Sequence, residues 1–312
     1  MLLRLVVIAA SLLPGCASLA LDDGTGTSWN LPNHLADAAR PPVRLSVIHT
    51  GETQGPKGFL VDGACWTQTV KLSHVAILVE HPNATFLFDT GLGRNVDAQT
   101  ADWSFWRHHM FSYTRHTSAV EQLEAHGFPS STVDYVVLSH LHWDHASGVP
   151  DFPHARVMVP AVERTEAMRH ATETSGFIGS QYNAKSVQWA DVAFEDGAVG
   201  PFPASKDLFH DGSVILLPLE GHTPGSMAML LELGSGRRVL FVGDLVWLHD
   251  GVEHPAQRSV IARNPVDGDA DRNWKAIQRV HHFHKANPDI LIAPAHDAEV
   301  MATLAAFPLW ER

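Results

Sequence analysis

The stretch SHLHWDHASG, residues 139–148, places three histidines and one aspartate within six consecutive positions. The run VDYVVL before it is apolar and predicts a buried strand, so the cluster follows the carboxyl end of that strand. His140 and His142 are two positions apart, and their rings can therefore face the same side. Asp144 and His145 follow in a turn, where the backbone can bend back toward them. Four donors in six residues can hardly all bind one ion, but they can serve two adjacent ions.

Three more candidate donors occur farther along the chain in a similar context. His222, Asp244 and His296 each follow an apolar run and meet a turn residue, as expected for residues at one edge of a sheet. A single histidine at a strand end is more often a polar cap or a core residue than a ligand. Seven donors in this arrangement, in a chain with 21 histidines, favour a metal centre instead. Imidazole and carboxylate donors without thiolates indicate zinc, with iron or manganese as alternatives.

The first 16 residues predict a signal peptide. They contain one arginine and then an apolar run that is too short to span a bilayer and ends in small residues. The segment Leu13–Cys16 resembles a bacterial lipoprotein signal, in which the cysteine is lipidated; ordinary secretion is the alternative. We therefore expect an exported protein, periplasmic or anchored to the outer membrane, that meets the membrane only through this lipid. Residues 17–42 are polar and rich in Gly, Asp and Pro, and we expect them to form a tether.

The charge of the chain bears on its partners. The net charge is −12, and the 22 lysines and arginines are scattered, which argues against nucleic acid as a partner. The apolar fraction of 45% is enough for a sizeable core. We expect the substrate to be a small molecule.

The pattern after residue 42 predicts one domain over residues 43–312. Strands and helices are expected in both halves of the chain, and this succession indicates two sheets packed on each other and covered outside by helices. The main expected strands are 43–51, 73–82, 84–91 (a buried strand that feeds a loop), 133–140 and 155–160, and the main expected helices are 118–128, 161–172 and 269–286.

The motif HLHWDH matches the HxHxDH signature, and the chain resembles the metallo-β-lactamase superfamily over roughly residues 43–300. The remaining motifs occur in the order found in that family. The resemblance implies an α/β fold, an αββα sandwich of two mixed β-sheets flanked by helices, with two divalent metal ions at one edge of the sheets. Zinc is the expected metal.

The resemblance also implies a role for each donor. One metal is expected to bind His140, His142 and His222, the other Asp144, His145 and His296, with Asp244 bridging the two. Asp89, in the motif FLFDTG, is expected to accept a hydrogen bond from a ligand histidine and so to fix its tautomer.

This ligand set predicts a hydrolase. Two metal ions about 3.5–4 Å apart share a hydroxide whose pKa falls to about 7. The hydroxide attacks an acyl or phosphoryl centre while one ion polarises the oxygen. We expect Asp144 or Asp244 to orient the nucleophile or to pass its proton to the leaving group.

The motifs look most like those of the quorum-quenching acyl-homoserine lactonases, which favours a lactone or another carboxylic ester as substrate. Exported β-lactamases of this fold lack the bridging aspartate, so Asp244 argues against a β-lactam. Hydrolysis of organophosphate triesters or, as in glyoxalase II, of thioesters is an alternative, and a mononuclear-iron persulfide dioxygenase is an alternative of another class. One departure is Trp247, which stands where those lactonases often carry a tyrosine that contacts the substrate carbonyl.

An aromatic-rich stretch at 99–117 predicts a substrate pocket. Trp103, Trp106 and Phe111 are expected to line it together with Trp247, over the metals. A surface loop anchored by its own aromatic side chains is the alternative.

Overall fold

The computed structural model describes residues 29–31, 41–171 and 176–312. The predicted signal peptide, 1–16, and most of the predicted tether lie outside these residues. Within the described part of that tether, Asn287 binds the backbone at both ends of 29–31, accepting from Leu31 N at 3.3 Å and donating to Trp29 O at 2.8 Å. Among the residues that the structure describes, no helix is both long and apolar enough to cross a membrane.

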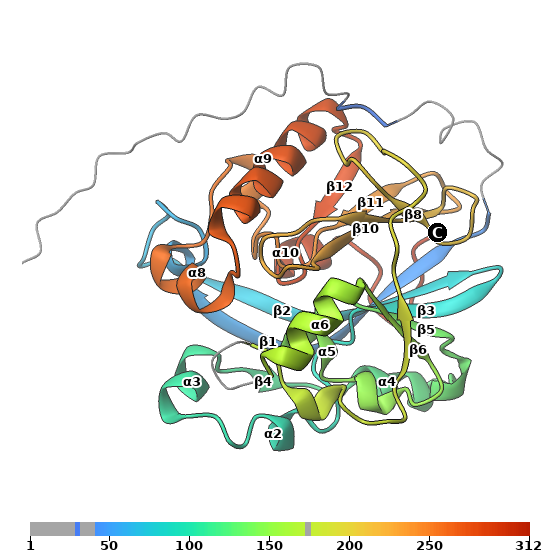
Figure 1. Cartoon of the computed structure of the whole chain (residues 1–312), viewed down its shortest axis with the longest axis horizontal. Coiled ribbons are helices and arrows are strands. Elements are labelled where there is room, and N and C mark those ends of the chain that lie inside the picture. Colours follow the sequence, from blue (N-terminus) through green and yellow to red (C-terminus); the bar gives the residue numbers. More distant parts are fainter. Residues whose placement is uncertain (1–28, 32–40, 172–175) are drawn as a thin grey trace, which may run out of the picture.

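Two mixed sheets form the centre of the molecule (Figure 1). The seven-stranded sheet has the order β4-β1-β2-β3-β5-β6-β7; its first three contacts are antiparallel and the β3-β5-β6-β7 part is parallel. The five-stranded sheet has the order β12-β11-β10-β9-β8, and only β11 and β12 are parallel. The first sheet comprises β1 (Arg44–Pro56), β2 (Thr69–His81), β3 (Ala84–Phe88), β4 (Thr114–Arg115), β5 (Tyr135–Val137), β6 (Arg156–Val159) and β7 (Gln188–Asp191). The second comprises β8 (Lys206–Asp207), β9 (Val214–Pro218), β10 (Met227–Glu232), β11 (Arg238–Phe241) and β12 (Ile290–Ala293).

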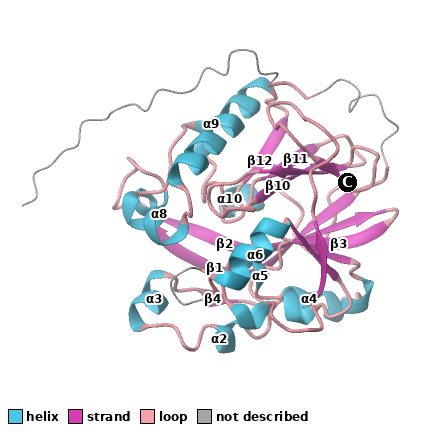
Figure 2. Cartoon of the chain, in the orientation of Figure 1, coloured by secondary structure: helices cyan, strands magenta, loops and turns pink. Residues whose placement is uncertain are grey.

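The helices lie on the outer faces of the two sheets and at their ends (Figure 2). Helix α9 packs Ile277, Val280 and Phe283 against the outer face of the five-stranded sheet, and α4 packs Val120 and Leu123 against the other sheet. The helices are α1 (Lys57–Leu60), α2 (Val96–Gln99), α3 (Phe105–Met110), α4 (Ala119–Ala125), α5 (Trp143–Ala146), α6 (Ala161–Arg169), α7 (Asp250–Glu253), α8 (Val260–Val266), α9 (Ala270–Ala286) and α10 (Ala298–Met301). Short 3-10 turns occur at Ser130–Thr132, Val149–Asp151 and Gly179–Gln181.

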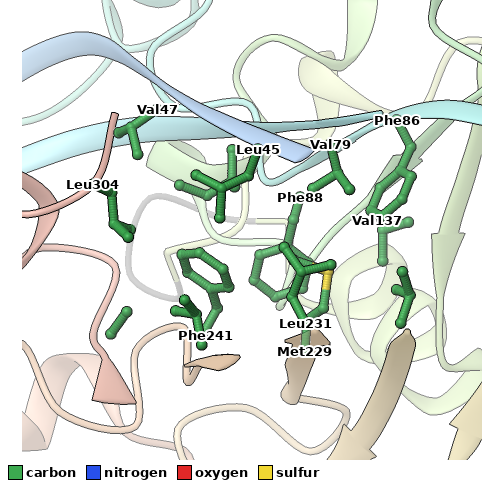
Figure 3. Close-up of a cluster of buried hydrophobic side chains, with 14 of the residues drawn as sticks. Leu45, Val47, Val79, Phe86, Phe88, Val137, Met229, Leu231, Phe241 and Leu304 are labelled. Carbon is green, nitrogen blue, oxygen red and sulfur yellow. The ribbon is translucent and has the colours of Figure 1, made fainter. Parts of the chain in front are cut away.

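The main core fills the space between the two sheets (Figure 3). Leu45, Val79 and Phe88 from the first sheet face Met229 and Phe241 from the second, and all five are at most 2% exposed. Alternate residues of these strands point the other way, toward the helices, which is the pattern of a sheet buried on both faces. The predicted αββα sandwich is therefore confirmed.

The predicted elements agree with the observed ones apart from their ends. Strand β1 continues to Pro56, five residues beyond the predicted end, because it pairs with β2 along its whole length. Strand β5 is shorter than predicted and ends at Val137. This early end matters for the site, since the chain leaves the sheet just before the histidine cluster.

Candidate metal centre

The seven predicted donors meet at one edge of the two sheets, where four strands end. The cluster at 140–145 follows β5 and includes the single turn α5. His222 follows β9, Asp244 follows β11 and His296 follows β12. Six of the seven residues are buried, and the side chain of Asp144 is only 11% exposed.

His140, His142 and His222 form the first donor group. His222 Nε2 lies 3.1 Å from His140 Nε2 and 2.9 Å from His142 Nδ1. Burial, together with the neighbouring imidazoles, holds the pKa of His140 and of His142 well below the usual value. Three buried imidazole rings that turn nitrogen atoms toward one another are the arrangement expected of metal ligands.

Asp244 connects this group to the second one. Its Oδ2 lies 3.6 Å from His222 Nε2, whereas its Oδ1 lies 3.2 Å from His145 Nε2 and 3.0 Å from His296 Nε2. Asp144 also belongs to the second group, with Oδ2 at 3.4 Å from His296 Nε2. One carboxylate thus presents an oxygen to each group, as a bridging ligand would.

The charge distribution at the second group favours a cation. Burial lowers the pKa of His145, but the carboxylates of Asp89, Asp244 and Asp144 outweigh it and raise that pKa well above the usual value. Among the described residues, His145 Nε2 and Asp244 Oδ1 are buried without a partner in hydrogen-bond geometry. Buried polar atoms of this kind carry a cost unless an ion or another ligand binds them. The donor set therefore fits divalent metal ions.

The ring nitrogens that face away from the two groups are also bound. His145 Nδ1 donates to Asp89 Oδ2 at 2.9 Å, His222 Nδ1 donates to Asp267 Oδ1 at 2.8 Å, and His296 Nδ1 donates to the Ser73 carbonyl at 2.8 Å. These bonds leave the Nε2 atoms free to coordinate. The sequence placed Asp89 in this role. Asp267 and Ser73 were missed, and no motif identified them.

Two further buried residues hold the loops that carry the predicted ligands in place. Glu163, on α6, accepts from Leu141 N at 2.8 Å, from Thr223 Oγ1 at 2.7 Å and from Gly225 N at 3.0 Å. Its carboxylate thus ties the His140–His142 loop to the loop of His222, and burial raises its pKa to about 6.

Arg258, only 1% exposed, donates to Asp267 at 2.7 Å and to the Asp244 carbonyl. No motif around Arg258 in the sequence indicates that it is buried or that it supports the site.

An apolar cavity of about 410 Å³ opens onto the second donor group. Asp144 and His296 lie at its inner end, beside Trp143. Its apolar walls come from α1, β2, α3 with the residue after it, and the loop that follows β11, and they include Phe59, Leu60, Leu72, Met110, Trp106, Phe111 and Trp247. A smaller cavity, of about 200 Å³, touches His142 and His222.

The four predicted pocket residues are not equivalent. Trp106 and Phe111 line the large cavity, and Trp247 does so while donating its indole N–H to Asp244 Oδ2 at 2.8 Å. That N–H is therefore engaged with the carboxylate of Asp244, the predicted bridging ligand. Trp103 does not line the cavity; it is buried behind it, with its ring centroid 4.9 Å from that of Trp143, and so supports the wall.

His74, in the middle of β2, was missed altogether. It is 4% exposed, lines the cavity and lies with Asp144 and His296 as a further potential ligand in the second donor group. Burial lowers its pKa more than Asp144 raises it. A lone histidine in an apolar strand gives no sequence signal that distinguishes it from a core residue.

A sandwich of two mixed sheets with this donor set at one edge defines a class of metal-dependent hydrolases. The chain matches the profile of the Metallo-beta-lactamase superfamily over residues 70–296 and belongs to that family.

Its relatives agree with that class. A probable metallo-hydrolase of Mycobacterium tuberculosis is 28% identical over 277 residues, which cover 85% of this chain and 83% of the relative. The N-acyl homoserine lactonase AttM of Agrobacterium fabrum is 26% identical over 190 residues, which cover 61% of this chain and 67% of AttM. The structure of an N-acyl homoserine lactone hydrolase with bound N-hexanoyl-L-homoserine superposes with a TM-score of 0.67 at 18% identity, covering 86% of this chain and 98% of that one. The chain is a metal-dependent hydrolase with lactonases among its relatives.

Proposed function

We propose that this chain opens a lactone or cleaves another carboxylic ester at a dinuclear metal centre. The observation that carries the proposal is the apolar cavity, which ends at a buried carboxylate within the donor cluster. Such a cavity suits an acyl group, and the polar atoms at its end suit the reacting carbonyl. The similarity to N-acyl homoserine lactonases supports the same substrate class.

Two divalent ions, when bound, would supply a hydroxide at neutral pH and a Lewis acid for the carbonyl oxygen. The protein's own contribution divides between two aspartates. Asp244 is held in place by the Trp247 indole, so its role is to bridge and orient. Asp144 lines the cavity and can take the proton of the attacking group and hand it to the leaving oxygen.

The surroundings of Asp144 keep its carboxyl group ionised, as a proton acceptor requires. Burial alone would raise the pKa of its carboxyl, but the imidazoles of His145, His296 and His74 lower that pKa by more. The carboxylate is thus ionised and able to accept a proton. In ester hydrolysis the acyl C–O bond breaks, and the leaving oxygen receives this proton.

A substrate panel tests the proposal. The full chain, loaded with zinc, manganese or iron, is assayed with acyl lactones of increasing chain length, aryl esters, thioesters, phosphotriesters and β-lactams. We expect turnover of lactones or aryl esters with two ions per chain. Preferred turnover of thioesters or phosphotriesters would replace the substrate class while keeping the hydrolase. One iron per chain, with oxygen uptake on a persulfide and no hydrolysis, would overturn the proposal.

A further inference from the structure

His74 lies on β2 opposite an irregularity of the neighbouring strand β1, beside the candidate metal centre. The pairing of β1 with β2 changes register between His49 and Gly51, directly opposite His74. The extra residue, Thr50, lies on β1, so the bulge bends β1 and places Thr50 beside His74. Thr50, at the bulge, donates its hydroxyl to the His74 carbonyl at 2.9 Å and fixes the backbone there.

The neighbouring residue already serves the centre. Ser73 accepts a hydrogen bond from the ring of His296 at 2.8 Å, and its own N–H donates to the His296 carbonyl at 2.9 Å. Strand β2 is therefore attached directly to the loop that carries a predicted ligand. His74, the next residue, turns its ring to the same side of the cavity as His296, with ring centroids 5.1 Å apart.

Both ring nitrogens of His74 are buried, and neither has a partner in hydrogen-bond geometry among the described residues. Its Nδ1 lies 3.3 Å from Asp144 Oδ2, and the same oxygen lies 3.4 Å from His296 Nε2. Two ligand atoms held about 2.1 Å from one tetrahedral zinc ion would be about 3.4 Å apart. The observed spacing is that of ligands to one ion.

From this geometry we propose that His74 is a ligand of the metal ion bound by Asp144 and His296. The inference rests on the proposed dinuclear centre and adds to it an eighth donor. An extra imidazole raises the number of protein ligands at the ion nearer the substrate cavity. That ion is then held more firmly and keeps fewer open positions for substrate.

Metal binding by the full chain tests this role without an activity assay. The apoprotein is titrated with cobalt(II) against a competing chelator, and the visible absorption of the bound cobalt is recorded. The variants are His74→Leu, which removes the donor, and His74→Gln, which keeps a polar group. His296→Leu is the positive control, and His109→Leu, which removes an exposed histidine lining the same cavity, is the negative control.

We expect wild type and His109→Leu to bind two ions. Both His74 variants should bind the second ion more weakly by at least about 10–100-fold, the loss typical of removing even an indirect partner of a metal, with an altered cobalt spectrum. Two ions bound with wild-type affinity and an unchanged spectrum would overturn the inference. Unchanged metal binding combined with a raised KM in a separate assay of the same variants would instead make His74 a substrate contact, and would also overturn the inference.

The dinuclear proposal fails in a different way, since wild type itself would then bind fewer than two ions. Circular dichroism establishes that each variant is folded. If His74→Leu does not fold, the affinity measured for His74→Gln decides the question.

Discussion

The two donor groups of the centre differ in what surrounds them. The group of His140, His142 and His222 is held by buried charges from elsewhere in the chain, Glu163 from α6 and Asp267 with Arg258. The group of Asp144 and His296 instead faces the large cavity, and its supports are the backbone of β2 and Asp89 through His145. The first group thus has the more buried charged supports and touches the smaller cavity, whereas the second group faces the larger one. A single site can combine these two surroundings because Asp244 spans the two groups.

Replacing Asp244 should break both groups at once. We expect Asp244→Ala to reduce hydrolysis to background and to lower the metal content of each group, because the carboxylate is the one donor they share. Turnover and metal analysis on the same sample measure this. The control is Asp289→Ala, an exposed aspartate before β12. Full activity in Asp244→Ala would rule out the bridging role.

Substituting the aspartates that hydrogen-bond the outer ring nitrogens of His222 and His145 should show how the two donor groups differ in support. Asp267→Asn and Asp89→Asn each weaken the hydrogen bond to a predicted ligand histidine, and each should cost about 10–100-fold in metal affinity. Asp267→Asn should cost more in stability, since it leaves the buried Arg258 without its counter-charge, a defect worth about 3–5 kcal/mol. Chelator competition and urea unfolding give the two quantities. Equal losses of stability in the two variants would contradict the difference in support.

The support that Glu163 gives to the group of His140, His142 and His222 can be tested by changing the pH. Burial raises its pKa from 4.5 to about 6, so its contribution to stability is complete below pH 4.5 and is lost as the pH rises through 6. The loss corresponds to roughly 2 kcal/mol. Glu163→Gln has no such titration, although its amide nitrogen leaves one backbone donor unpaired. The unfolding free energy of the apoprotein minus that of Glu163→Gln should therefore fall between pH 4.5 and 7. A difference independent of pH would show that Glu163 keeps an ordinary pKa.

The smallest effect is expected at the rim of the large cavity, which opens onto the second donor group. Trp106 lines the cavity but is 75% exposed, so it can add only part of its apolar surface to a bound acyl chain. Trp106→Ala should raise KM a few-fold for long-chain substrates, by about 1 kcal/mol of lost contact, and leave kcat unchanged. Phe105→Ala is the matched control, since Phe105 is equally exposed on α3 but does not line the cavity. A fall in kcat would place Trp106 in the reaction itself.

The sequence predicted more of the fold than of the supports around the site. Strong apolar runs and the polar donors at their ends were enough to predict two packed sheets with a candidate metal site at one edge. His74, Glu163 and Asp267 could not be found in the same way, because their meaning depends on which loops the fold places beside them. Glu163 is one of two acids on the short helix α6, and only its burial distinguishes it. Trp103 and Trp106 are three residues apart in the sequence, yet one supports the cavity wall from behind and the other lines the cavity.

The bond between His296 and Ser73 has a consequence for how the protein folds. It joins residues 223 positions apart, and β12, which delivers His296, is the last strand in the chain. We expect contacts between such distant segments to form late in folding. A long loop must first close, and its entropy cost precedes the favourable energy of the contact. The complete centre therefore exists only in the finished fold. Metal ions that bind it should slow unfolding, while the rate of folding stays nearly the same.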